Sequence, residues 1–147
     1  MIHWPIDNNL SSSYSKPIEG KKMIELDFKK MNGLIPAAIQ DYKTNELLMV
    51  GFMDKAAWEK TLEMGKVNFF SRTRNKAWLK GETSGNFQIV KEIFVGCELD
   101  SVLIKIEQIG EATCHEGYKS CYFRKLENGE LKIISQRIFD PKVVYKK

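Results

Sequence analysis

Residues 101–109, which read SVLIKIEQI, carry the clearest strand pattern in the chain. Successive side chains of a β-strand point to opposite faces, so Val102, Ile104 and Ile106 share one face of this stretch. They alternate with Leu103, Lys105 and Glu107, which belong to the other face. The alternation predicts a half-buried strand, with one side in a hydrophobic core and the other toward solvent.

Similar stretches extend from this strand in both directions along the chain. Apolar and β-branched residues predict paired strands at 34–40 and 46–52, joined by a turn over 41–45. Further strands are predicted at residues 67–71, 77–80, 87–95, 122–125 and 131–138.

One helix is predicted between the second and third of these strands. Asp54 is a suitable N-cap, and Gly65 suits the end of a helix that runs to about Met64. Its inward face is expected to carry Ala57, Trp58, Thr61, Leu62 and Met64.

These elements predict an α+β fold that is mainly β, a compact single domain of antiparallel strands with one principal helix. Residues 1–22 contain turn formers without hydrophobic periodicity, so we expect a loosely packed N-terminal extension there. The domain is expected to occupy residues 23–147, a length that suits one hydrophobic core.

The composition excludes several classes of protein. The chain has 147 residues, 43% of them hydrophobic and 29% charged, which is ordinary for a globular protein. No apolar run approaches the length of a membrane span, and the N-terminus lacks the pattern of a signal peptide. The net charge of +4 permits an anionic partner without requiring nucleic acid. Free cysteines without an export signal predict a cytoplasmic protein.

All three cysteines fall within one short stretch of the C-terminal half. Cys97 follows Gly96, and Cys114 and Cys121 bracket a polar turn that contains His115. Three thiolates that leave one position open to water are a ligand set for catalytic zinc. Buried cysteine is also a small hydrophobe, and packing alone is the alternative interpretation.

A basic segment with glycines, residues 71–86, is the second informative region. Arginine suits bidentate contact with phosphate, glycine allows a close backbone approach, and Trp78 could stack on a base. A charged hairpin in solvent is the alternative. The candidate binding residues are Ser71, Arg72, Arg74, Trp78, Lys80, Gly81, Thr83, Ser84 and Gly85.

The two regions together predict metal-activated water and anion binding in one small domain. This combination suits hydrolysis of a phosphorylated or nucleotide-like substrate. His115, one residue from a cysteine, is the candidate to accept or relay a proton; a supporting partner or a fourth metal ligand is the alternative role.

The ordered series of motifs resembles the phosphoribosyl-AMP cyclohydrolase family of histidine biosynthesis. The resemblance covers roughly residues 33–125 and rests on SRTR at 71–74, WLKGETSGN at 78–86, Gln88, VKE at 90–92, Cys97-x-x-Asp100 and Cys114-His115-x-Gly117-x-x-Ser120-Cys121.

The resemblance implies an activity, two metals and an assembly. Water would attack C6 of the adenine ring of 1-(5-phosphoribosyl)-AMP and open the N1–C6 bond to give the formimino-carboxamide ribonucleotide. Members are intertwined homodimers with active sites at the interface, and one Zn²⁺ per subunit would be held by Cys97, Cys114 and Cys121, drawn from both chains. A nucleotide is the expected partner, with no membrane and no nucleic acid.

The implied Mg²⁺ site is incomplete in this sequence. The family assigns it to three acids, and their positions here are Gly96, Glu98 and Asp100. Magnesium accepts waters in place of protein ligands, so loss of one carboxylate predicts weaker binding. Two alternatives remain open, a catalytically weakened family member and a zinc-stabilised module that binds nucleotide or nucleic acid.

Overall fold

The computed structural model describes residues 24–145 of the chain. The proposed N-terminal extension, residues 1–22, lies outside this range. No helix within 24–145 has the length and apolar character needed to cross a membrane.

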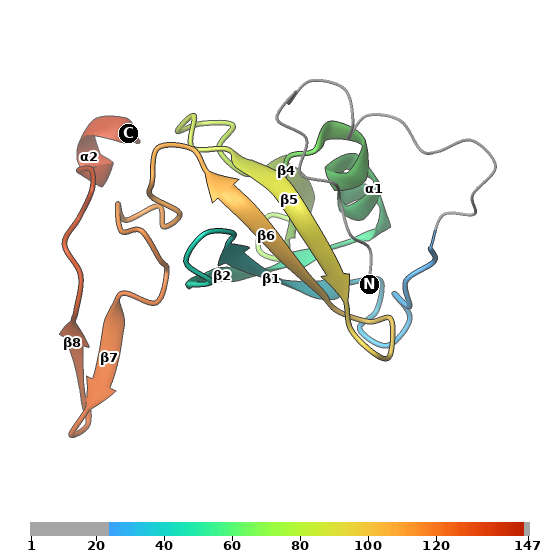
Figure 1. The fold of residues 1–147 in the computed structure, drawn as a ribbon, viewed down its shortest axis with the longest axis horizontal. Coiled ribbons are helices and arrows are strands. Elements are labelled where there is room, and N and C mark those ends of the chain that lie inside the picture. The colour runs from blue at the N-terminus through green and yellow to red at the C-terminus, as the bar shows by residue number, and fades with distance from the viewer. Residues whose placement is uncertain (1–23, 146–147) are drawn as a thin grey trace.

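The centre of the fold is a four-stranded sheet in the order β2-β1-β6-β5 (Figure 1). Its strands are β1 (Ile35–Asp41), β2 (Leu47–Met53), β5 (Gln88–Val95) and β6 (Val102–Gln108). In β6 the residues Val102, Ile104 and Ile106 are buried and those between them are partly exposed, which confirms the predicted half-buried strand.

The prediction that all strands are antiparallel is wrong for the central pair. β1 pairs with β2, and β5 with β6, as antiparallel neighbours, but β1 and β6 are parallel, with Ile39 beside Ile104. A short turn makes the two strands of a hairpin antiparallel, whereas no turn joins β1 to β6. Their relative direction is decided by the packing of two hairpins against a common core.

The helix α1 (Lys55–Met64) begins and ends at the predicted residues. The Asp54 carboxylate accepts a hydrogen bond from the Ala57 N–H at 2.8 Å, and Gly65 ends the helix with φ of 67°. Ala57, Trp58 and Thr61 are buried as predicted, and Leu62 packs against the core. The placement of Met64 on the inward face is wrong, because its side chain is 45% exposed at the helix end.

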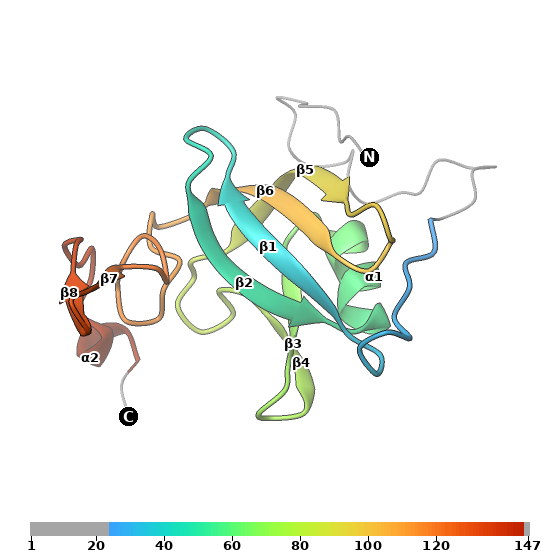
Figure 2. The same cartoon turned by 90° about the horizontal axis from the view of Figure 1, so that it is seen from below.

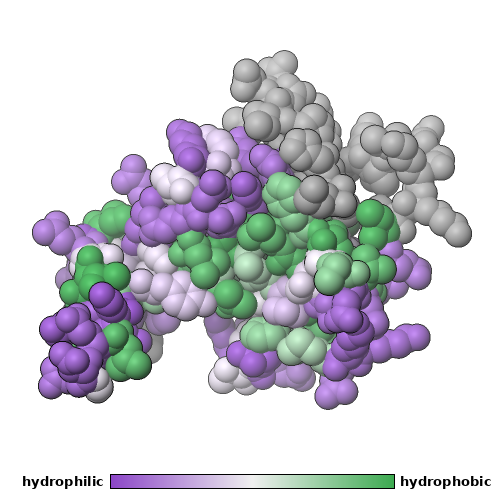
Figure 3. All heavy atoms as spheres, turned by 60° about the horizontal axis from the view of Figure 1, so that its bottom comes forward, coloured by the Kyte–Doolittle hydropathy of each residue, from purple (hydrophilic) through white to green (hydrophobic). Residues whose placement is uncertain are grey.

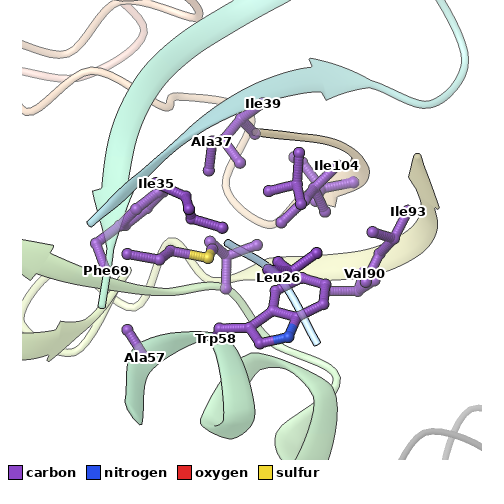
Figure 4. Close-up of a cluster of buried hydrophobic side chains, with 14 of the residues drawn as sticks. Leu26, Ile35, Ala37, Ile39, Ala57, Trp58, Phe69, Val90, Ile93 and Ile104 are labelled. Atoms are coloured by element: carbon purple, nitrogen blue, oxygen red, sulfur yellow. The ribbon is translucent and has the colours of Figure 1, made fainter. Parts of the chain in front are cut away.

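One face of the sheet forms the hydrophobic core with α1 and the hairpin of β3 (Asn68–Ser71) and β4 (Lys76–Leu79). Figure 4 shows Ala57 and Trp58 pointing from the helix toward Ile35 and Ala37 of the sheet. Phe69 packs on Trp78 with ring centroids 5.3 Å apart. This packing fixes the β3–β4 hairpin, and with it the basic segment, relative to the sheet.

The C-terminal part forms an arm of two short strands, β7 (Arg124–Glu127) and β8 (Glu130–Ile133), which projects from the main body (Figures 1 and 2). The predicted strands at 122–125 and 131–138 are misplaced. Asn128 and Gly129 both have positive φ, the geometry of a two-residue hairpin turn, so pairing starts on either side of them. A short helix, α2 (Pro141–Val144), follows and was not predicted.

Candidate active site

The basic segment and residues 112–121, the cysteine segment, meet at one cavity of about 410 Å³. The lining residues come from β2, the β3–β4 hairpin, the glycine turn at 81–86, the cysteine segment and the C-terminal end. They are Met49, Arg74, Trp78, Lys80, Gly81, Glu82, Thr83, Ser84, Thr113, His115, Cys121 and Tyr145.

The glycine turn places its hydroxyl residues, Thr83 and Ser84, at the cavity. Gly81 has φ of 94°, and its carbonyl accepts a hydrogen bond from the Gly85 N–H at 2.7 Å. A Cβ at Gly81 would lie 2.6 Å from backbone atoms of Asn86 and Phe87. Glycine is therefore required at position 81 because the backbone of Asn86 and Phe87 passes close to it. This contact makes the turn tight.

The two arginines of the basic segment have different positions. Arg74 lines the cavity. The Arg72 guanidinium instead lies over the Phe52 ring, 3.9 Å from its centroid. Ser71 does not line the cavity; its hydroxyl accepts a hydrogen bond from the Arg74 N–H at 3.2 Å and so shapes the turn that presents Arg74.

The cysteine segment is folded on itself and fastened to the sheet. The Cys114 N–H donates to the Tyr118 carbonyl at 3.0 Å, and the Cys121 N–H donates to the Leu48 carbonyl of β2 at 2.8 Å. The Ser120 hydroxyl donates to the Leu47 carbonyl at 2.8 Å. The first bond closes the turn that contains Cys114. The other two attach Cys121 and Ser120 to the first residues of β2.

An ion-pair network fastens the same segment to the β1–β2 turn. The Lys119 ammonium lies 3.6 Å from an Asp41 carboxylate oxygen and 3.2 Å from Glu46. Burial acts to raise the pKa of Asp41, but the N–H groups of Lys43 and Thr44 and the charge of Lys119 together hold it below the ordinary value of 3.8.

The two thiols and a lysine lie close enough to influence one another electrostatically. Burial raises the pKa of the Cys121 thiol to about 12; the charge of Cys114 adds to this rise and the Lys80 ammonium opposes it. Burial lowers the pKa of Lys80, and Cys121 and Cys114 oppose that fall. A divalent cation would favour the thiolate forms, because ligating thiols are deprotonated.

These thiols fit a zinc ion as part of its ligand set. Zinc prefers thiolate sulfur, and Cys114 and Cys121 supply two such ligands side by side. Within the described residues, however, no three histidine, cysteine or acidic side chains are grouped to hold a metal. Cys97 is exposed and precedes β6, whereas Cys114 is buried and follows this seven-residue strand, which is about 20 Å long.

His115 is exposed and lines the cavity beside Cys121, so its ring is within the space where a ligand would bind.

The turn with Cys97 holds the candidate magnesium residues. Lys30 lies 3.5 Å from a carboxylate oxygen of Glu98 and 3.5 Å from one of Asp100. Gly96 does not have a positive φ, but a Cβ there would lie 2.5 Å from the Ser101 hydroxyl. The two acids already have a cationic partner, and the third position has little room for a side chain.

A polar network behind the cavity was not found by sequence reasoning. The Gln108 side-chain carbonyl accepts hydrogen bonds from Thr113 Oγ1 at 2.7 Å and Gln88 Nε2 at 3.1 Å. Its amide nitrogen donates to the Asn86 carbonyl at 2.9 Å. Gln88 is fully buried, and a glutamine at an inward position of a strand could have indicated such a network.

The chain is similar to several known proteins. The family model described as phosphoribosyl-AMP cyclohydrolase matches residues 49–123. A phosphoribosyl-AMP cyclohydrolase of Desulforapulum autotrophicum is 57% identical over 125 residues, which cover 84% of this chain and all of the relative. That of Geotalea uraniireducens is 58% identical and covers 85% of this chain and all of the relative. That of Desulfotalea psychrophila is 49% identical over 124 residues, 84% of this chain and 98% of the relative.

The matches and the cavity define a hydrolase of nucleotide metabolism. The chain belongs to the phosphoribosyl-AMP cyclohydrolase family, whose members act in histidine biosynthesis.

Proposed function

We propose that this chain adds water to C6 of the adenine ring of 1-(5-phosphoribosyl)-AMP and opens the N1–C6 bond. One observation carries the proposal: the basic segment and the cysteine segment of this family member meet at a single cavity. Its volume of about 410 Å³ is within the usual range for small-molecule sites.

The anionic part of the substrate would lie against one wall of the cavity. Arg74 offers a guanidinium fork for a phosphate, and the hydroxyls of Thr83 and Ser84 can donate to further oxygens. Trp78 presents a partly exposed indole for contact with the base. Arg72 is committed to Phe52, so Arg74 is the better candidate of the two arginines.

The reacting end of the base would lie against the cysteine segment. Zinc, when bound, supplies a water whose pKa is lowered toward neutrality. We propose that His115, which lines the cavity, accepts a proton from the attacking water and returns it to N1 as the bond opens. Cys114 and Cys121 would hold the metal from one chain.

Cys97 of a second copy is our proposed third ligand. Since the described residues of one chain do not bring Cys97 together with the other two cysteines, a second copy is needed to complete the set. A homodimer with sites at its interface would supply it, because each copy then contributes a different part. This proposal agrees with the free state of all three cysteines, which also favours a cytoplasmic location.

Exposed apolar side chains support the dimer. On the arm Leu126, Leu131 and Ile133 are each at least 59% exposed. Figure 3 shows apolar side chains on the arm and across the middle of the main body. A hollow of about 360 Å³ on the outer face of the sheet is lined in part by Val50 and Gly96. A second copy on this face would bury apolar surface beside Cys97.

Magnesium would bind only weakly at the turn that contains Cys97. Glu98 and Asp100 can both reach a cation, but Lys30 competes with it for both carboxylates. We therefore propose Zn²⁺ as the principal metal and Mg²⁺ as a weaker one.

The test is turnover of 1-(5-phosphoribosyl)-AMP by the purified full chain with Zn²⁺, followed as loss of the adenine absorbance. We expect ring opening that is abolished in Cys114→Ser. Zinc binding without turnover would contradict the proposal and favour a weakened family member or a binding module.

A further inference from the structure

Lys80 follows β4 and points into the molecule. Lys80 is only 8% exposed, and its ammonium donates a hydrogen bond to the Thr113 carbonyl at 2.6 Å. The ammonium also lies 5.6 Å from the centroid of the Trp78 ring. None of the ion pairs between residues 24 and 145 includes Lys80. A buried ammonium without a carboxylate partner carries a desolvation cost that needs an explanation.

Both Cys121 and Cys114 are near enough to act on this ammonium electrostatically. Thr113, which accepts its hydrogen bond, directly precedes Cys114 in the chain. Cys121 and Lys80 line the same cavity. Lys80 therefore lies beside the one position in the described chain where two thiolates would form side by side.

A phosphate ligand would be placed differently. Arg74 and the hydroxyls of the glycine turn are presented at the cavity, whereas the tip of Lys80 is already bound to a backbone carbonyl in the cavity wall. One of its three N–H donors is occupied there, and a lysine that is only 8% exposed offers little surface to a phosphate in the cavity. Thiolates beside it require no movement, because their charge acts through space on the ammonium where it is.

We propose that Lys80 is a positioning residue and charge partner of the Cys114–Cys121 pair, and not a phosphate ligand. Its ammonium, fixed on the Thr113 carbonyl, offsets the net negative charge that three thiolates, two from this chain and one from a second copy, leave around a bound Zn²⁺. The inference rests on the proposed zinc site of the preceding subsection. A cation held at a fixed place beside a metal site of net negative charge lowers the free energy of the metal-bound state by Coulomb attraction, and burial strengthens that attraction.

The acceptor of Lys80 is itself held in place. The Thr113 hydroxyl donates to Gln108 at 2.7 Å, and the Thr113 N–H donates to the Lys119 carbonyl at 3.0 Å. The Thr113 carbonyl therefore has a defined direction, and the ammonium bound to it has a defined position relative to both cysteines.

The experiment measures Zn²⁺ affinity by competition with a chromophoric chelator, using the metal-free full chain. The variants are Lys80→Met, which removes the charge at similar length, Lys80→Arg, which keeps a charge, and Arg74→Met, a control in the same cavity. We expect Zn²⁺ binding to weaken about 10- to 100-fold in Lys80→Met, with partial recovery in Lys80→Arg and no change in Arg74→Met.

A second measurement separates the two roles. Inorganic phosphate is titrated as a competitor of substrate turnover at saturating Zn²⁺, and the inhibition constant should rise in Arg74→Met and stay unchanged in Lys80→Met. The sulfur-to-metal charge-transfer band of the Co²⁺-loaded protein should be weaker in Lys80→Met at equal Co²⁺ concentration. Melting of the metal-free proteins serves as the control for folding, and Lys80→Met should melt no lower than the wild type, because it removes a buried charge.

The results discriminate clearly. Equal Zn²⁺ affinity in wild type and Lys80→Met would overturn the role of Lys80 and leave the proposed function standing. A raised phosphate inhibition constant in Lys80→Met with unchanged Zn²⁺ affinity would identify Lys80 as a phosphate ligand instead. A wild-type chain that fails to bind Zn²⁺ would overturn both proposals.

Discussion

Replacement of Gln108 by methionine tests whether the polar network fixes the two walls of the cavity. The side chain accepts hydrogen bonds from Thr113 and Gln88, and its amide nitrogen donates to the carbonyls of Asn86, Phe87 and Ile109. It thereby ties the cysteine segment to the end of the glycine turn. Methionine has a similar length and can make none of these bonds, so Gln108→Met removes the connection with little change in volume.

The magnitude follows from three of these bonds, the two that Gln108 accepts and the shortest that it donates, at 2.9 Å to Asn86. At about 1 kcal/mol each they contribute about 3 kcal/mol, and we expect a loss of about 2 kcal/mol because Gln108 is half-buried and water can reach Asn86. The largest part should arise at Gln88, which is fully buried and whose Oε1 already has no hydrogen-bond partner. Gln88→Met in the Gln108→Met background should therefore add little, with a coupling of about 1 kcal/mol in the double-mutant cycle.

Urea unfolding of the four proteins in the cycle measures these free energies, and steady-state kinetics measures KM for the substrate. Gln40→Met is the matched control, because it makes the same substitution. The Gln40 side chain donates a hydrogen bond to the Asn45 carbonyl at 2.7 Å, but this bond is exposed. We expect KM to rise in Gln108→Met and to stay constant in the control. A stability loss below about 0.5 kcal/mol in Gln108→Met, with KM unchanged, would refute the reasoning.

Three further predictions concern the metals, the assembly and the pH dependence. Cys114→Ser should lose its zinc by metal analysis as well as its turnover, and chelation of the wild type should lower its melting temperature; full zinc occupancy in the variant would remove the assignment. A mixture of inactive Cys97→Ser and Cys114→Ser should recover activity on subunit exchange, because one site of each mixed dimer is intact, and exchange without recovery would place each site within one chain. Asp41→Asn should destabilise the chain by about 1 kcal/mol at neutral pH. The pKa of Asp41 is lowered in the folded chain, so its contribution is complete above the ordinary value of 3.8 and is lost as the pH falls below it; melting curves at several pH values should converge in acid, and a constant difference would contradict this account.

A final prediction concerns Gly96, where an aspartate would restore the third acid of the magnesium string. A Cβ there lies 2.5 Å from the Ser101 hydroxyl, so Gly96→Asp alone should destabilise the turn by about 1 kcal/mol. Gly96→Asp with Ser101→Ala should relieve this contact and lower the Mg²⁺ concentration for half-maximal activity at saturating Zn²⁺. An unchanged half-saturation in the double variant, with zinc retained, would show that the missing carboxylate does not limit Mg²⁺ binding.

Local patterns in the sequence were sufficient for the elements that depend on near neighbours. The helix from Lys55 to Met64 was predicted to the residue because an N-cap and a C-terminal glycine act within one turn of the helix. The buried face of β6 was predicted because the side-chain period of a strand is two. The arm was misplaced because its Asn128–Gly129 turn, although local, was not recognised as the residue pair that sets the register.

Only the tertiary structure decided what depends on contacts between distant segments. The parallel pairing of β1 with β6, and the meeting of Arg74 with Cys121 at one cavity, arise from packing of hairpins that no short turn connects. The sequence placed three cysteines in one stretch and so determined a thiolate-rich region, yet β6 lies between Cys97 and Cys114, and the described residues do not group the three cysteines. It also marked Lys80 as one cation of a basic segment, and burial against the Thr113 carbonyl is what separates it from the others, since the chemistry of a charged side chain depends on the groups that surround it.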